Sequence, residues 1–156
     1  MSETKILKKK NYLAMIENSA KGENWMFRNF YVEKDGQEID VLDNGGWSCA
    51  AFVSGILYLN KLIKDVHANT FSVEKDMLES GWQEVKDLRP GAVLFWEKKI
   101  AKDDGLEHGH HGFYIGNDVA ISNDSQGKGF PWKHHYTYND TRKIQKIYWH
   151  SALDEK

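Results

Sequence analysis

The stretch DNGGWSCAAFVSGILYLN, Asp43 to Asn60, holds the only cysteine of the 156-residue chain, Cys49. A glycine pair and Ser48 precede the cysteine, and an apolar run follows it. Ser48 is expected to cap a helix, which would place Cys49 in the first turn of that helix. The apolar positions then recur at helical spacing and predict one buried face, made by Phe52, Ile56, Leu59 and Ile63, with Val53 and Leu57 beside them.

Two interpretations of Cys49 follow from this position. A lone buried cysteine behaves as a small apolar side chain, and this is the commoner case. At the start of a helix, however, free N–H groups and the positive end of the helix dipole favour a thiolate. The same N–H groups can hold the oxyanion that forms when a thiolate attacks a carbonyl. The sequence therefore leaves open a core side chain and a nucleophile.

Composition bounds the class of protein. The formal net charge of −2 offers no basic field for nucleic acid, and a single cysteine makes no internal disulfide. The N-terminus lacks the apolar stretch of a signal peptide, and no run approaches the roughly 20 apolar residues of a membrane span. We expect one domain, residues 1–156, made in the cytoplasm, with no nucleic-acid partner and no integral membrane association. The sequence defines no oligomeric state.

Helical patterns come first along the chain and strand patterns follow. Helices are expected from about Lys5 to Ala20, from Ser48 onward, and from about Ser72 to Gly81. The Asp35-Gly36 turn indicates an ordered loop or a short hairpin. Strands are expected at Ala92–Trp96, on both sides of the Gly-Asn-Asp turn at 116–118, at 134–138 and at 144–150. This order predicts an α+β fold, with N-terminal helices packed on a central antiparallel β-sheet.

A thiolate nucleophile usually needs an imidazole partner. In GHHGFYIGN, residues 109–117, His110 and His111 occupy adjacent strand positions, so their side chains should point to opposite faces. The rival chemistry is a metal site, for which the ligand types are present but match no compact zinc spacing: His108, His110, His111, Asp103, Asp104 and Glu107.

Three segments together resemble the NlpC-type and CHAP branches of the papain-like cysteine peptidases: GGWSCAAFVSGIL, LRPGAVLFW and HGHHGFYIGNDVAISN. The resemblance covers about residues 43–124 and implies a papain-like fold. It implies that Cys49 is the nucleophile and His110 the general base. The family's third polar residue lies twelve positions after the histidine, which is Ser122. The adjacent Asn123 is chemically better suited to orient an imidazole, and we slightly favour it as the third catalytic residue.

The resemblance also implies a substrate and its contacts. Ser48 stands where the family has Asp before the nucleophile, Ala92 where it has Asp after Pro-Gly, and His111 where it usually has Val. We expect substrate contacts from Trp47, Ser48, His111 and Trp96, and further aromatic walls from Trp25 and Trp132. No cofactor or metal is expected.

The implied reaction is hydrolysis of an amide bond in bacterial cell-wall peptidoglycan, by an endopeptidase or an amidase. Without a leader, non-classical export, delivery by another apparatus or lysis would bring the protein to the wall. Alternatives are an acyltransferase or a lipid or thioester hydrolase on the same scaffold, and a non-catalytic binding module.

Overall fold

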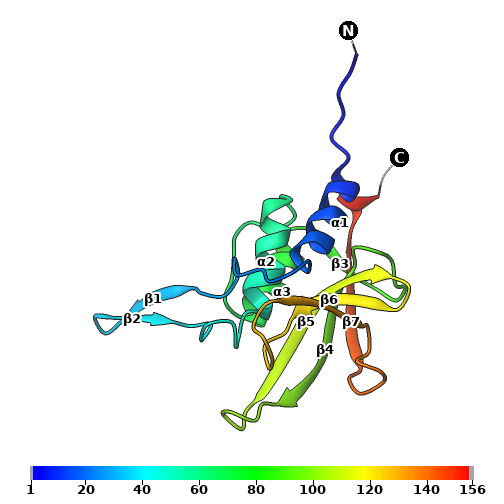
Figure 1. The fold of residues 1–156 in the computed structure, drawn as a ribbon. Coiled ribbons are helices and arrows are strands. Elements are labelled where there is room, and N and C mark those ends of the chain that lie inside the picture. Colours follow the sequence, from blue (N-terminus) through cyan, green and yellow to red (C-terminus); the bar gives the residue numbers. More distant parts are fainter. Residues whose placement is uncertain (1, 155–156) are drawn as a thin grey trace.

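Residues 2–154 are described by a computed structural model and form helices, one large sheet and a separate hairpin (Figure 1). The helices are α1 Lys8–Ser19, α2 Cys49–Leu59, α3 Thr70–Glu79 and the short 3-10 helix η1 Ser151–Leu153. The strands are β1 Tyr31–Lys34, β2 Gln37–Asp40, β3 Trp82–Val85, β4 Val93–Ile100, β5 Glu107–Gly116, β6 Val119–Asn123, β7 Pro131–His135 and β8 Ile144–His150.

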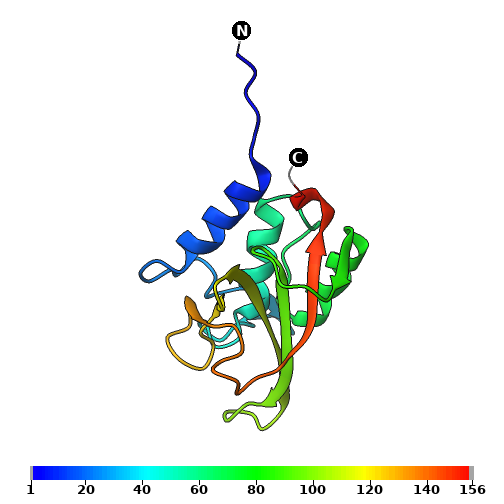
Figure 2. The same cartoon turned by 90° about the vertical axis from the view of Figure 1, so that its right-hand side faces the viewer.

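The large sheet has six strands in the order β3-β8-β4-β5-β6-β7, and each neighbouring pair is antiparallel. Helix α2 packs on β5 and β6, α3 packs on β3 and β5, and α1 contacts α2 and β5. The predicted α+β class, with helices on an antiparallel sheet, is confirmed. The β1–β2 hairpin projects from the body, and both described ends of the chain lie on the same side (Figures 1 and 2).

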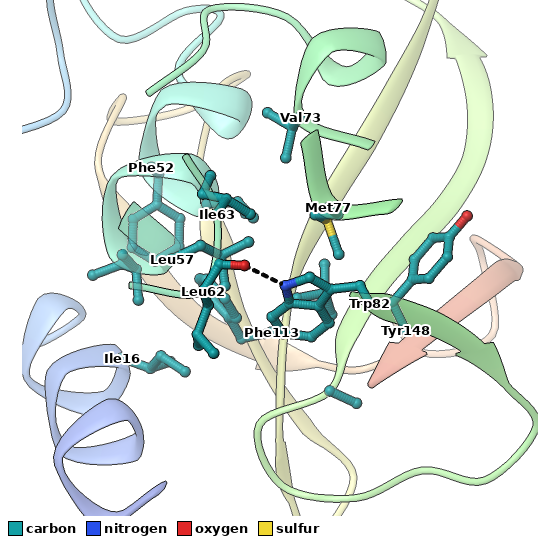
Figure 3. Packing of buried hydrophobic residues seen from close by; sticks show 14 of the residues in the cluster. Ile16, Phe52, Leu57, Leu62, Ile63, Val73, Met77, Trp82, Phe113 and Tyr148 are labelled. Carbon is teal, nitrogen blue, oxygen red and sulfur yellow. Dashed lines mark hydrogen bonds between the residues drawn. The ribbon is translucent and has the colours of Figure 1, made fainter. Parts of the chain in front are cut away.

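The main core lies between the helices and one face of the sheet. Helix α2 is buried almost all round, from Cys49 to Leu57, because it lies between the sheet and the other helices. The rings of Phe52 and Phe113 meet edge to face at 5.5 Å, which joins α2 to β5. The indole N–H of Trp82 donates to the carbonyl of Leu62 at 2.9 Å, so this buried polar group is satisfied (Figure 3).

The opposite face of the sheet carries a second, smaller core of Leu94, Trp96, Tyr114 and Ala120. Residues 136–144 cover it, and the indole N–H of Trp96 donates to the carbonyl of Tyr136 at 2.7 Å. Because both faces are covered here, β4 begins with four consecutive buried residues rather than an alternating pattern.

Several predicted elements differ from the structure in their details. Helix α2 ends at Leu59, which is half exposed, and Ile63 reaches the core from the following loop. The chain leaves the helix through Lys61, whose φ of 55° is left-handed. The strand expected at 134–138 is β7, Pro131–His135, and the residues after it turn. Strand β3 was not predicted, because only its first and last residues are apolar.

Candidate functional site

A tightly held loop leads the chain into Cys49. Asp43 and Asn44 have positive φ angles of 47° and 49°, and Gly45 follows with 98°. A Cβ on Gly45 would lie 2.5 Å from the carbonyl oxygen of Gly129, so the loop between β6 and β7 packs directly on this glycine. Gly45 therefore satisfies two requirements, a left-handed backbone and a close approach to another chain segment.

The carboxylate of Asp40 anchors the same loop. It accepts hydrogen bonds from the backbone N–H groups of Phe30, Leu42 and Asn44, at 2.8 to 3.1 Å. Although desolvation alone would raise the pKa of Asp40, these bonds together with one from the side chain of Asn29 lower it to about 2. The loop is thus fixed at its start by an ionised carboxylate.

Cys49 is the first residue of α2, and only 9% of its surface is exposed. Burial raises the pKa of its thiol to about 11, while the backbone N–H groups of Ala50 and His111 act in the opposite direction. The helix start thus favours a thiolate, as the sequence predicts, but burial outweighs it. In the resting protein at neutral pH the side chain is a thiol.

Ser48 does not cap the helix as predicted. Its φ and ψ of −84° and 6° are close to helical values, whereas a capping side chain needs an extended backbone to reach the free N–H groups. The hydroxyl makes no capping bond, and its oxygen is buried without a hydrogen-bond partner. The free N–H groups at the start of α2 therefore remain able to donate hydrogen bonds to the sulfur or to a ligand.

Two cavities meet at Cys49. One has a volume of about 310 Å³ and the other about 340 Å³, and they share the lining residues Trp47, Cys49, His108 and Gly109. The rings of Trp47 and His108 lie 4.2 Å apart between them. We call these two adjoining cavities the groove; Cys49, at the start of α2, lines both of them.

His110 reaches this groove from the sheet. It lines the larger cavity together with Cys49, and its ring stacks on that of Trp96 at 5.2 Å. His111 points to the other face, where its ring meets Phe95 edge to face at 4.9 Å. The predicted divergence of the two histidines is confirmed. Within the described residues no hydrogen bond joins the Cys49 sulfur to the His110 ring, although both residues line one cavity.

A hydroxyl lies behind the His110 ring. Oγ of Ser122 is 3.0 Å from Nε2 of His110, 2.7 Å from Nε2 of His134 and 3.0 Å from the hydroxyl of Tyr138. Gly112 makes this arrangement possible, because a Cβ there would lie 2.7 Å from the Ser122 Cβ. The hydroxyl is therefore the centre of a buried polar network.

The directions of these hydrogen bonds follow from the partners. Nδ1 of His134 lies 2.7 Å from the carbonyl of His135, which can only accept, so Nδ1 carries a hydrogen. Burial lowers the pKa of His134 to about 4, so its ring is neutral at pH 7 and Nε2 holds a lone pair. The single hydrogen of the Ser122 hydroxyl must then point to His134.

The tautomer of His110 follows in turn. Since Ser122 has already donated its hydrogen, it can only accept from Nε2–H of His110 and from the hydroxyl of Tyr138. Burial, followed by the charge of Arg142, holds the pKa of His110 well below its usual value, so the ring is neutral. Its lone pair therefore lies on Nδ1, the nitrogen that has no partner in the network.

Of the two candidates for the third residue, Ser122 contacts the imidazole and Asn123 does not. Phe113 pairs with Ile121, which leaves Ser122 on the face of His110 and turns Asn123 to the other. The Asn123 amide donates to the carbonyl of Gly45 at 3.0 Å and to Ser125 at 2.9 Å. Asn123 thus braces the loop before the cysteine, and the contact that we expected from it is made by Ser122.

The remaining predicted residues divide into two groups. Trp47 and Trp132 line the groove, while Trp96 lies behind His110 and Trp25 lines neither cavity. Ser48 and His111 are fully buried and line neither cavity. Both ring nitrogens of His111 lack a hydrogen-bond partner, and burial lowers its pKa to about 3.

The predicted catalytic and substrate-binding residues do not include His134, Tyr138 or Arg142, although the sequence allows the stretch with His134 and Tyr138 to line the cleft. The stretch containing His134 and Tyr138 reads as a strand with a surface aromatic cluster, and only the pairing of β6 with β7 brings it behind Ser122. Arg142 follows the turns at 136–141 and precedes β8, and nothing in the sequence around it signals a cleft.

Within residues 2–154, no three side chains of His, Cys, Asp or Glu come together as a group that could hold a metal ion. Asp104 and His108 pair at 2.6 Å, while His110 and His111 point apart. No helix of this part of the chain has the length and apolarity needed to cross a membrane.

The chain matches no protein-family model and no curated protein.

Proposed function

We propose that the protein is a cysteine hydrolase that cleaves an amide bond through a thioester, with Cys49 as nucleophile and His110 as general base. One observation carries this proposal: His110, a neutral imidazole with its Nδ1 lone pair free, lines the same cavity as Cys49, the residue that begins α2. A nucleophile, a base and a third group behind the base are the parts that this chemistry needs.

The reaction begins from a neutral pair. Nδ1 of His110 takes the proton from the Cys49 sulfur as the sulfur attacks the carbonyl carbon. The negative charge moves to the carbonyl oxygen, where backbone N–H groups at the start of α2 can stabilise it. The His110 imidazolium then returns the proton to the leaving nitrogen, the carbon–nitrogen bond breaks, and a thioester remains.

Hydrolysis of the thioester repeats these roles. Nδ1 of His110 accepts a proton from water as the water oxygen attacks the thioester carbon. The carbon–sulfur bond breaks, the proton returns to the Cys49 sulfur, and the product leaves as a carboxylic acid. Nε2–H of His110 keeps its bond to Ser122 throughout, so Ser122 orients the ring in both steps.

The missing Cys49–His110 hydrogen bond is compatible with this mechanism. Hydrogen bonds between catalytic groups are often long in a free enzyme and tighten when substrate or transition state is bound. The raised pKa of Cys49 and the lowered pKa of His110 indicate that the proton moves during the attack, since neither residue is charged beforehand at pH 7.

The finer assignment is a papain-like hydrolase of the NlpC/CHAP type that acts on peptidoglycan. It is supported by the motifs and by their order in the fold: a cysteine that begins a helix, then antiparallel strands that carry the histidine and Ser122. Trp47 and Trp132 on the groove walls suit a peptide or glycopeptide. Three cationic side chains on the larger cavity favour a polar substrate over an acyl chain: Lys99, Lys102 and Arg142.

The test is digestion of purified bacterial sacculi, with mass spectrometry of the released fragments. The wild-type protein should release fragments with new amino and carboxyl ends, and Cys49→Ala should release none. Ser151→Ala, which changes an exposed serine that lines neither cavity, should match the wild type. Equal digestion by wild type and Cys49→Ala would overturn the nucleophile. No digestion by any of the three would overturn the peptidoglycan substrate.

A further inference from the structure

Arg142 is held rigidly at the larger cavity. Its Nε donates to the carbonyl of Glu97 at 2.9 Å and its Nη2 to the carbonyl of His108 at 3.3 Å. These two contacts tie the guanidinium to β4 and β5, on the wall that also holds His110. Because both partners are neutral carbonyls, the guanidinium keeps its full charge and further N–H donors.

No carboxylate neutralises that charge within the described residues. Arg142 forms no ion pair, and the Glu97 carboxylate, whose charge it feels, accepts instead from the backbone N–H of Lys143. Desolvation lowers the pKa of Arg142, the usual result when a cation is partly removed from water. A half-buried guanidinium without an anionic partner is unfavourable by itself and attracts an anion strongly.

The neighbouring charges strengthen this attraction. Lys99 and Lys102 line the same cavity, and the Lys99 ammonium is held against the carbonyl of Thr141 at 2.8 Å. Asp124, an acidic residue that also lines this cavity, already accepts a hydrogen bond from the backbone N–H of Lys128 through Oδ2 at 3.0 Å. The larger cavity is therefore cationic, whereas the smaller one carries Asp104.

The guanidinium also lies close enough to the reacting groups to act on them. Burial raises the pKa of Cys49, and the charge of Arg142 partly opposes this rise. For His110 the same charge adds to the effect of burial and lowers the pKa further. Both effects require that Arg142 lies near the two reacting residues, in agreement with the cavity that all three line.

We propose that Arg142 is the centre of a carboxylate-binding subsite, so that the substrate of the proposed hydrolase is a peptide with a free carboxylate close to the scissile amide. This inference depends on the proposed function and names its substrate class. A fixed guanidinium suits the purpose, since it offers a carboxylate two parallel N–H donors in a planar arrangement.

The competing role for Arg142 is stabilisation of the thiolate alone. Two alkylating reagents of nearly equal size separate the two roles, because iodoacetate is anionic and iodoacetamide is neutral. Each forms a carbon–sulfur bond at Cys49 and releases iodide. The ratio of the two rate constants at one pH cancels the thiolate fraction, so a pure effect on the pKa of Cys49 leaves the ratio unchanged.

The experiment measures both rate constants for Cys49 in the folded protein at low ionic strength, by mass spectrometry, with the ratio normalised to that of 2-mercaptoethanol. The wild type should prefer iodoacetate. Arg142→Gln should lower the normalised ratio about fivefold to tenfold, as expected for loss of one charge-assisted contact partly screened by solvent. Arg142→Lys should retain part of the preference. Lys86→Gln, an exposed change of equal charge outside both cavities, should retain all of it.

A normalised ratio near one in the wild type, or a ratio that Arg142→Gln leaves unchanged in a protein of wild-type circular dichroism, would overturn the subsite while Cys49 remains reactive. Failure of both reagents to modify Cys49 would instead overturn the proposed function, and the subsite with it.

Discussion

The hydroxyl of Ser122 lies 2.7 Å from Nε2 of His134, closer than to His110 or Tyr138, and this contact fixes the direction of the other hydrogen bonds in the network. With the Ser122 hydrogen committed to His134, His110 must donate from Nε2 and keep its lone pair on Nδ1. Three residues from two strands and one turn, Ser122, His134 and Tyr138, thus set the protonation state of the His110 ring.

Ser122→Ala should slow the reaction while leaving substrate binding nearly unchanged. The alanine leaves His110 without its orienting partner, so we expect the rate at saturating sacculi to fall about tenfold or more. It also leaves three polar groups unpaired, one buried and two half-buried, which should lower the free energy of unfolding by about 1–3 kcal/mol. Digestion rates and urea denaturation measure the two effects, and a wild-type rate at saturating sacculi would contradict the role of Ser122.

The tautomer of His110 is directly observable. Nitrogen-15 NMR at neutral pH should find the proton of His110 on Nε2 and the lone pair on Nδ1. His134→Phe keeps an aromatic ring but removes the acceptor, so the Ser122 hydroxyl can turn and the His110 signals should shift toward a mixture of tautomers. A wild-type ring protonated on Nδ1 would contradict the assigned directions.

Gly45→Ala should damage both stability and activity. The new Cβ would lie 2.5 Å from the Gly129 carbonyl oxygen in a left-handed backbone, so the loop before Cys49 must move. Gly36→Ala is the matched control, because its φ is also positive, 75°, but nothing lies within 4 Å of its Cβ. We expect Gly36→Ala to lose only the conformational term, about 1–2 kcal/mol, and to keep full activity. Equal losses in thermal denaturation and sacculus digestion would contradict the steric argument.

His111 should make the fold sensitive to acid. Burial lowers its pKa to about 3, against about 6.5 in the unfolded chain, so the unfolded state binds more protons between these values. Stability should therefore fall as the pH drops from about 6.5 toward 3. The Cys49 carbonyl and the Glu74 carboxylate, which face the ring, reduce this effect without cancelling it.

The variant His111→Val isolates this contribution, since the buried network of His110 and His134 stays in place. Its free energy of unfolding should exceed that of the wild type by a margin that grows as the pH falls below 6.5. Urea denaturation at several pH values measures the difference, and a margin independent of pH would contradict the assignment.

Local patterns in the sequence predicted most of the fold. The helix from Cys49, the strands on both sides of the Gly-Asn-Asp turn and the last long strand are confirmed, because their apolar spacing and turn residues act over short range. Strand β3 was missed because its pairing with β8 outweighs its weak pattern. The sequence left Cys49 open between a core side chain and a nucleophile: the helix start favours a thiolate, but burial, which only the folded chain defines, has the larger effect on its pKa.

The site was only partly predictable, because some of its residues come together only in the tertiary fold. Cys49 and His110 stand in recognisable motifs, and they do line one cavity. The choice between Ser122 and Asn123 depends on which face of β6 each occupies, and the strand register settles that contact. His134 and Arg142 come from segments beyond the motifs, and only the tertiary fold brings them to Ser122 and to the cavity.

The most direct test of the central claim is the rate at which iodoacetamide alkylates Cys49 in the wild type and in His110→Gln, with Lys86→Gln as the control. If His110 draws the proton from the thiol, the rate at pH 7 should fall about 10²-fold in His110→Gln and stay unchanged in Lys86→Gln. The wild-type rate should also persist below pH 6.5, because the lowered pKa of His110 keeps its base form populated there. Equal rates in the wild type and His110→Gln would show that the thiol and the imidazole do not act together.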